Sequence, residues 1–211
     1  MVKMPCRDLQ LLNPAGLVPF EWQFGLPTIQ GSKITLREVR DTDAESLLAM
    51  LTTADVAEFV APLPRTVDGF SAFIAETHVQ RMLGNSFCFA IVPDGYEDAM
   101  GLFQVRQLEP GFDSAEWGFA IGSPFWGSGI FVEGARAVID FSFGVVGVHR
   151  LEARSIATNA RANAALRKVG ACQEGFLRRS FRKNGRLLDQ LMWSIVKDDW
   201  LLQRAPSPTF H

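Results

Sequence analysis

The stretch of sequence best suited to chemistry is a glycine-rich turn at residues 122–129, which follows a strand-like run and opens a helix-like run. Gly127 and Gly129 allow the backbone to bend tightly there and to approach a ligand closely. The first N–H groups of the following helix lack partners within the helix, and with the helix dipole they favour a phosphate or pyrophosphate. A tight turn that binds nothing would use the same glycines, so both interpretations remain open at this point.

Two common nucleotide-binding motifs are excluded for this turn. A Walker loop would continue with Gly-Lys-Ser or Gly-Lys-Thr, and no such sequence follows. A dinucleotide fingerprint would read Gly-x-Gly-x-x-Gly, which is absent, and the order of the predicted strands also differs from that fold. A phosphate at this turn therefore implies another kind of fold.

Cysteine and histidine give no sign of metal or redox chemistry. Cys6, Cys88 and Cys172 are far apart and form no Cys-x-x-Cys motif, and the three histidines are equally scattered. We therefore predict no metal site, and we expect Cys88 to be a small residue of the core. The absence of a disulfide framework favours the reducing cytoplasm.

Composition limits the partners of the chain. Its 211 residues carry a formal net charge of −2, which argues against a basic surface for nucleic acid. No run approaches the roughly 18 apolar residues of a membrane span, so we expect no membrane partner. The chain has 17 phenylalanines but a single tyrosine, Tyr96, so a mechanism that needs a tyrosine has one candidate.

Hydrophobic periodicity predicts the elements that must hold the turn in place. Asp-Thr-Asp at 41–43 is a candidate N-cap for a first helix through Leu47 and Leu51, and Asn184-Gly185 indicates a tight hairpin. Later helices are predicted at 67–83, 132–143 and 159–168, and strands at 33–40, 87–92, 100–105, 115–121, 150–156, 175–182 and 187–196. This order favours an α/β fold, an α+β sandwich with one central mixed sheet flanked by helices.

Residues 1–32 differ from the rest because prolines and glycines interrupt an apolar stretch. We predict an irregular arm over 1–32, a single domain over 33–203 and a tail over 204–211. Trp22 and Phe24 are expected to pack against the domain.

Several motifs, taken in their order along the chain, resemble the GNAT N-acetyltransferase superfamily, above all its ribosomal-protein-alanine (Rim-type) branch. The resemblance spans residues 33–200, about four-fifths of the chain. The motifs are Ile-Thr-Leu-Arg at 34–37, Trp-Gly-Phe-Ala-Ile at 117–121, Trp-Gly-Ser-Gly at 126–129, His-Arg-Leu-Glu-Ala at 149–153 and Leu-Arg-Lys-Val-Gly at 166–170.

The resemblance implies that acetyl-CoA is the acyl donor and lies in a V-shaped gap where central parallel strands separate. The backbone N–H groups that it assigns to the pyrophosphate are those of Trp126, Gly127, Ser128, Gly129 and Ile130. The strand residues that it assigns to the pantetheine amides are Phe119, Ala120 and Ile121. Asn159 is expected to bond the pantetheine arm or the carbonyl region, with a helix N-cap as its alternative or additional role.

Glu116 is the candidate general base that would take a proton from the amine. It precedes Trp117-Gly118, where GNAT enzymes of this type often carry a carboxylate, and an apolar, Trp-rich setting would raise its pKa by desolvation. The alternative is a solvated charge at the strand edge, or an ion pair with Arg106 or Arg154.

Two departures from the family pattern stand out. The family's usual Gln or Arg, three positions before the first loop glycine, is Pro124 here, which has no N–H to offer. The helix after Asn159 carries no tyrosine, the usual acid towards the leaving sulfur.

Basic residues gather around the predicted hairpin turn. They are Arg178, Arg179, Arg182, Lys183 and Arg186. A solvated hairpin tip explains them, and so does a rim that attracts an acidic peptide or the adenosine phosphate of the cofactor.

We therefore predict an acetyl-CoA-dependent N-acetyltransferase that acts on a primary amine, either a protein or peptide N-terminus or a small molecule. The alternative is a GNAT domain that binds acyl-CoA without turnover, as a sensor or interaction module. A homodimer is retained as a possible assembly.

Overall fold

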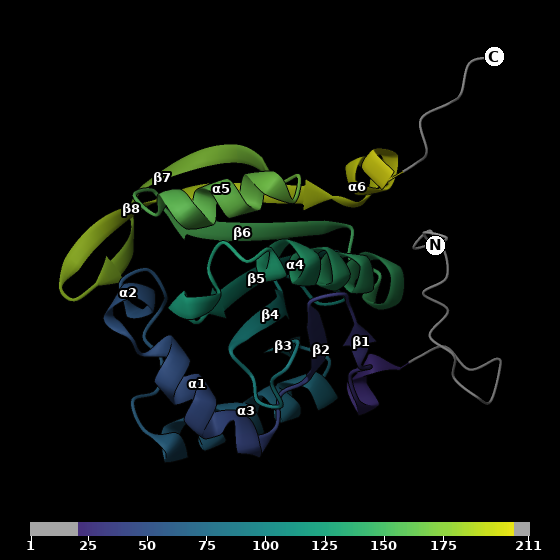
Figure 1. The fold of residues 1–211 in the computed structure, drawn as a ribbon. Coiled ribbons are helices and arrows are strands. Elements are labelled where there is room, and N and C mark those ends of the chain that lie inside the picture. Colours follow the sequence, from purple (N-terminus) through teal and green to yellow (C-terminus); the bar gives the residue numbers. More distant parts are fainter. Residues whose placement is uncertain (1–20, 205–211) are drawn as a thin grey trace.

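The computed structural model describes residues 21–204, so Cys6, His211, the first 20 residues of the predicted arm and the predicted tail from 205 onward lie outside it. Its centre is one eight-stranded mixed sheet with the order β1-β2-β3-β4-β5-β6-β8-β7 (Figure 1). The strands are β1 (Ile29–Gln30), β2 (Ile34–Glu38), β3 (Ser86–Pro93), β4 (Gly101–Gln107), β5 (Ser114–Ile121), β6 (Arg150–Ile156), β7 (Cys172–Lys183) and β8 (Arg186–Val196).

Helices cover both faces of this sheet (Figure 1). They are α1 (Ala44–Leu51), α2 (Ala54–Ala57), α3 (Val67–Met82), α4 (Ile130–Phe141), α5 (Ala160–Lys168) and α6 (Lys197–Arg204). Because successive side chains of a strand point to opposite sides, Cys88 packs with α1 and α3, whereas Phe87 and Phe89 pack against Phe141 of α4. The predicted α/β fold with a central mixed sheet is confirmed.

The parallel pair β5 and β6 separates part-way along its length. The two strands pair only from Ser114 with Arg150 to Glu116 with Glu152. β5 then continues to Ile121 and β6 to Ile156 without further pairing between them. Every other neighbour of these strands is antiparallel, so this is the place in the sheet where two parallel strands diverge.

Periodicity located the main elements well, but it missed three short ones and misjudged the first helix cap. β1, α2 and α6 were not predicted. Asp43 was predicted within an N-cap sequence, yet its side chain makes no cap bond to α1. It is fully buried and accepts hydrogen bonds from Nη1 and Nη2 of Arg37, at 2.8 and 2.7 Å. Its Oδ2 also accepts the backbone N–H of Arg40 at 2.8 Å, so the carboxylate caps the 3-10 turn Asp41–Asp43 rather than α1 itself.

The described part of the predicted arm contributes to the domain. Trp22 is 6% exposed and belongs to the core, whereas Phe24 is 82% exposed, so the prediction that Phe24 packs is wrong. β1 pairs with β2. The backbone N–H of Lys33 donates to Glu133 of α4 at 3.2 Å, which ties the β1–β2 turn to the start of that helix.

Cys88 is buried, and burial raises the pKa of its thiol to about 12, which suits the predicted core role. Among residues 21–204, no helix is both long and apolar enough to cross a membrane. In the same part of the chain, His, Cys, Asp and Glu form no group of three that could hold a metal ion.

Candidate active site

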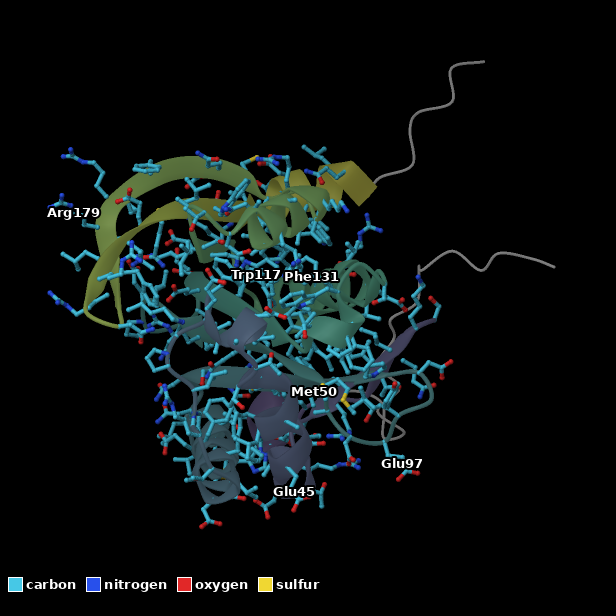
Figure 2. The ribbon with its side chains drawn as sticks, turned by 60° about the vertical axis from the view of Figure 1, so that its left-hand side comes forward. Glu45, Met50, Glu97, Trp117, Phe131 and Arg179 are labelled. Atoms are coloured by element: carbon cyan, nitrogen blue, oxygen red, sulfur yellow. The ribbon has the colours of Figure 1, made fainter. Side chains whose placement is uncertain are left out.

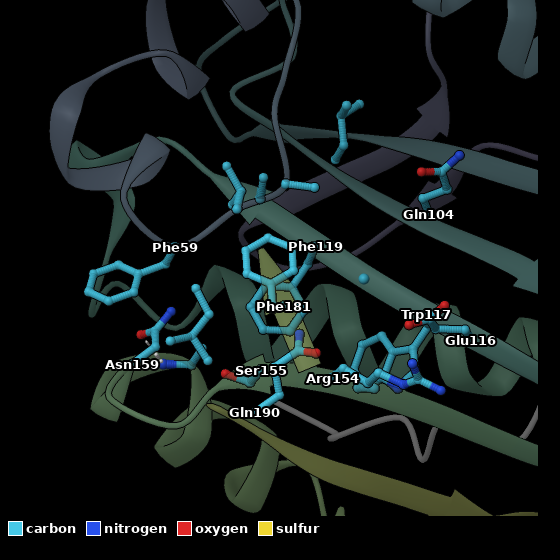
Figure 3. A pocket seen from close by; sticks show the side chains of 18 of the residues that line it. Phe59, Gln104, Glu116, Trp117, Phe119, Arg154, Ser155, Asn159, Phe181 and Gln190 are labelled. Atoms are coloured by element: carbon cyan, nitrogen blue, oxygen red, sulfur yellow. Dashed lines mark hydrogen bonds between the residues drawn. The ribbon is translucent and has the colours of Figure 1, made fainter. Parts of the chain in front are cut away.

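The gap between β5 and β6 opens into a cavity of about 510 Å³ (Figure 3). β5 contributes Glu116 and Phe119 to its wall, and β6 contributes Ser155. The segment between α2 and α3 adds Phe59, and the β7–β8 hairpin adds Phe181. Four segments distant in sequence therefore converge on one opening, because the separated strands leave backbone and side chains without a neighbouring strand.

A second cavity of about 270 Å³ adjoins the first at the glycine-rich loop. Its wall includes Gly127 and Gly129 of that loop and Arg161 of α5. Six residues line both cavities: Phe59, Val60, Phe119, Ala120, Asn159 and Ala162. A ligand that enters along the loop can thus reach the gap between the strands.

The loop has free backbone donors beside this second cavity. Gly127 and Gly129 have φ angles of 77° and 91°, in the left-handed region that glycine adopts readily. A Cβ at Gly127 would meet no protein atom within 4 Å, which leaves that side open. Within the described chain, the N–H groups of Gly127, Ser128 and Gly129 have no hydrogen-bond partner. This set of donors at the start of α4 suits an anion such as a phosphate.

The other two predicted loop donors are already engaged. The N–H of Trp126 donates to Ser123 O at 3.2 Å, and that of Ile130 to Ser128 Oγ at 3.4 Å. Pro124 lies in a 3-10 turn, Ser123–Phe125, at a position where proline is accommodated. Its missing N–H therefore removes no bond that this turn needs.

The edge of β5 that faces the gap has fewer free backbone N–H and C=O groups than predicted. Gly122 donates its N–H to Met100 O at 2.9 Å, on the β4 side. Because backbone groups alternate along a strand, those of Phe119 and Ile121 face the gap. Ile121 O accepts a hydrogen bond from Trp126 Nε1 at 2.9 Å, so its acceptor is partly used. Phe119 retains its backbone groups at the open edge.

Asn159 has the capping role that was considered for it. Its Oδ1 accepts a hydrogen bond from the N–H of Ala162 at 3.0 Å, and the residue lines both cavities. Sequence reasoning missed Asn163, which is buried and donates from Nδ2 to Ile156 O at 3.2 Å while accepting from Trp193 Nε1 at 3.0 Å. The available signal was an asparagine on the inward face of a predicted helix, because a buried amide needs hydrogen-bond partners.

Glu116 lies where the strands separate, in an ion pair with Arg106 of β4. Both residues line the larger cavity. Trp117, 2% exposed, points to the opposite face of the strand and stacks near Phe103, so this tryptophan does not surround the carboxylate. The observed ion pair is the alternative considered from the sequence, and it holds the carboxylate at the cavity wall. A catalytic role for Glu116 stays a prediction.

Two buried polar atoms near the gap have no partner within the described residues: Trp117 Nε1 and Ser155 Oγ. Both residues line the larger cavity, one on each separated strand. The two atoms are also shielded from solvent, so neither can contact a ligand without local rearrangement. Tyr96 is half exposed and packs edge-on against Phe125 at 5.3 Å, and it lines neither cavity.

The basic hairpin has one residue with a structural task. Lys183 donates hydrogen bonds to Ala57 O and Val60 O, which joins the β7–β8 hairpin to the last residue of α2 and the segment after it. Burial lowers the pKa of Lys183. Arg179 instead projects outward from the hairpin, whereas Trp117 and Phe131 lie in the interior (Figure 2). Two walls of the larger cavity are therefore tied together by a single ammonium group.

A model of the family described as "Acetyltransferase (GNAT) domain" matches residues 33–171. The chain belongs to the GNAT acetyltransferase family. The match includes the loop, the separated strands and α5, which line the two cavities of this GNAT protein, whereas the β7–β8 hairpin in the wall of the larger cavity lies beyond it.

Relatives and solved structures agree with this assignment. A Bacillus licheniformis protein named "Uncharacterized N-acetyltransferase p20" is 24% identical over 176 residues, which are 83% of this chain and 99% of the relative. Ribosomal-protein-S5-alanine acetyltransferase from Vibrio fischeri has a TM-score of 0.75 at 19% identity, covering 83% of this chain and 99% of its own. Mycobacterium smegmatis RimJ in complex with CoA-disulfide has a TM-score of 0.70 at 24% identity, covering 79% and 83%. The family and its named relatives make this GNAT protein an acyltransferase, with a resemblance to the Rim type.

Proposed function

We propose that this GNAT protein is an acetyl-CoA-dependent N-acetyltransferase that acts on a primary amine, in the first place the α-amino group of a protein or peptide. The observation that carries the proposal is the separation of β5 from β6 beyond Glu116, beside a loop with three free N–H groups. One end of this arrangement suits a phosphate, and the other opens into a cavity with a carboxylate in its wall.

The residues of the smaller cavity fit an acyl-CoA by their own chemistry. The N–H groups of Gly127, Ser128 and Gly129 beside it suit a pyrophosphate, and no protein atom lies within 4 Å of the place that a Cβ of residue 127 would take. The free backbone edge at Phe119 can pair with amide groups in the manner of an added strand. Acetyl-CoA would supply a thioester, an acyl group already activated for transfer to an amine.

Glu116 would accept the proton that the amine must lose before it can attack. Arg106 holds this carboxylate where the strands separate, on the wall of the larger cavity. Confinement of the amine beside the activated acyl group supplies much of the remaining acceleration. Tyr96 lies outside both cavities, so we assign the proton for the leaving sulfur to water.

The larger cavity supports a peptide as the acceptor. Its volume of about 510 Å³ lies within the range of ligand pockets, and it combines apolar walls at Phe59 and Phe181 with amide side chains at Gln104 and Gln190. Amides can bond a peptide backbone, and aromatic walls can hold its first side chains. The structural neighbours named as ribosomal-protein acetyltransferases point the same way.

Calorimetry with acetyl-CoA, followed by thiol release with a panel of amines, tests the proposal. The panel contains short peptides with free N-termini, the same peptides with blocked N-termini, and small primary amines. We expect binding, and turnover that requires a free α-amino group. Turnover with small amines alone would show that the acceptor is a small molecule and not a peptide. Acetyl-CoA binding without any turnover would favour the alternative, a sensor or interaction module.

Replacing Gly127 with alanine is expected to weaken acetyl-CoA binding by about 10-fold or more. The positive φ of 77° strains any residue with a Cβ by about 1–2 kcal/mol, and the new methyl group enters the open space beside the free N–H groups. Gly111 is a matched control, because it also has a positive φ, 99°, and open space around a Cβ, but it lines neither cavity. G111A should lose similar stability and keep its affinity. Equal affinity in both variants, measured by calorimetry, would contradict a phosphate role for the loop.

A further inference from the structure

Arg161 occupies a place on α5 that the dipole of its own helix does not favour. It is the second residue of the helix, where the helix dipole disfavours a cation, and the first turn of α5 contains no acidic residue to offset it. Arg161 has no ion-pair partner among residues 21–204. The helix dipole therefore does not stabilise this exposed cation, and an anion bound at the cavity would have an unpaired guanidinium to contact.

Trp126 holds this arginine beside the glycine-rich loop. The guanidinium carbon of Arg161 lies 3.5 Å from the centre of the Trp126 ring, a close cation–π contact. Trp126 is itself fixed, because its Nε1 donates to Ile121 O at 2.9 Å. The residue that follows it is Gly127, the first of the three with a free N–H. The stacked guanidinium is therefore fixed next to the loop donors.

The charge of the smaller cavity is consistent with an anionic occupant. Its titratable lining residues are Asp55, Arg161 and Lys168, so the wall carries one excess positive charge. Gly127 and Gly129 of the loop line the same cavity. A planar guanidinium can form two parallel hydrogen bonds with a phosphate while its face remains on an aromatic ring.

We propose that Arg161 binds the pyrophosphate of the acyl donor and thereby adds, from α5, a cation to the N–H groups of the loop. This inference rests on the proposed function, since it needs an acyl-CoA as ligand.

The experiment measures ligand affinities of wild type, Arg161→Gln and Arg167→Gln by calorimetry. Arg167 is the matched control because it also lies on α5 over a tryptophan, 5.4 Å from the ring centre of Trp193, but it does not line the smaller cavity. The ligands are acetyl-CoA, its analogue without the 3′-phosphate, and S-acetylpantetheine, which has no phosphate. Both variants place glutamine, a good helix former, at exposed sites.

We expect R161Q to bind acetyl-CoA and the analogue without the 3′-phosphate about 10-fold or more weakly, to bind S-acetylpantetheine as wild type does, and to show less weakening by salt. R167Q should bind all three ligands with the affinity of wild type. Equal affinity of R161Q and wild type for acetyl-CoA overturns the inference. A loss that disappears without the 3′-phosphate, or that persists with S-acetylpantetheine, overturns the pyrophosphate assignment.

Failure of the proposed function gives a different pattern. Acetyl-CoA binding that depends on Arg161, without acetylation of any amine in the panel, ends the proposed enzyme activity and leaves the role of Arg161 standing. Acetylation of an amine in the panel, together with unchanged acetyl-CoA affinity in R161Q, supports the proposed enzyme activity and overturns the role of Arg161. A wild-type protein that binds no acetyl-CoA overturns both.

Discussion

A Glu116→Gln variant should transfer acetyl groups about 10²- to 10⁴-fold more slowly than wild type at neutral pH, the range that a general base contributes. Glutamine keeps the shape of the side chain but cannot accept the proton of the amine. Glu116 lies where β5 and β6 separate and lines the larger cavity, whereas acetyl-CoA is expected at the loop. The loss should therefore fall on kcat, with acetyl-CoA affinity within about 2-fold of wild type.

The ion pair with Arg106 requires a control, because E116Q also breaks that contact. Arg106→Gln breaks the same ion pair and leaves the carboxylate in place. R106Q should lose less than about 10-fold in kcat, since the pair is largely exposed on the arginine side and such pairs are weak. If R106Q and E116Q lose activity equally, the contact is structural and the assignment of Glu116 as base is wrong.

The pH dependence distinguishes a base from a positioning residue. As the pH rises towards the pKa of the acceptor amine, a growing share of the amine is already neutral in solution and needs no base. The deficit of E116Q should therefore shrink with rising pH, in steady-state assays at saturating acetyl-CoA. A deficit that is constant from pH 7 to 10 would contradict proton removal by Glu116.

Replacing Asp43 with asparagine should lower the free energy of unfolding by about 3–5 kcal/mol, which corresponds to a fall in Tm of roughly 6–20 °C. Asp43 is fully buried and also accepts the N–H of Ala99 at 3.0 Å. Arg37 is almost as buried and would keep its charge without a carboxylate. The cost arises from this uncompensated charge, and the same cluster anchors α1, whose Leu51 lines the larger cavity.

Asp41→Asn is the matched control, because Asp41 lies two residues away in the same 3-10 turn and is exposed. Its Tm should stay within about 2 °C of wild type. If calorimetry gives D43N the same Tm as wild type, the buried pair contributes nothing net to stability.

At acid pH, the free energies of unfolding of wild type and D43N should lie closer together than at pH 7. Burial alone would raise the pKa of Asp43, but the hydrogen bonds from Arg37, Arg40 and Ala99 outweigh it and hold that pKa below its usual value. A lowered pKa in the folded state means that the stabilisation is complete above the ordinary aspartate pKa of about 4 and is lost as the pH falls through the lowered one. Denaturant unfolding at pH 7 and at pH 3 should show this convergence.

Hydrophobic periodicity and turn chemistry predicted most of this fold because both depend on local sequence. The strand at 150–156 was located to the residue, and Asn184-Gly185 does form the turn between β7 and β8. The fate of Asp43 was not predictable in the same way. Its position before a helix predicts a local cap, which it provides at the 3-10 turn, but its burial against Arg37 of β2 depends on tertiary contact.

By itself, the sequence determined the main elements, the family and the loop at residues 122–129, since hydrophobic periodicity is local and glycine reaches the left-handed conformations that this tight strand–helix turn uses. Only the tertiary structure decided which donors of that loop are free, that Glu116 pairs with Arg106, and that Arg161 stacks on Trp126. The physical reason is that hydrogen bonds and ion pairs join residues across elements. Their partners are chosen by the packing of the sheet and helices, which no local pattern records.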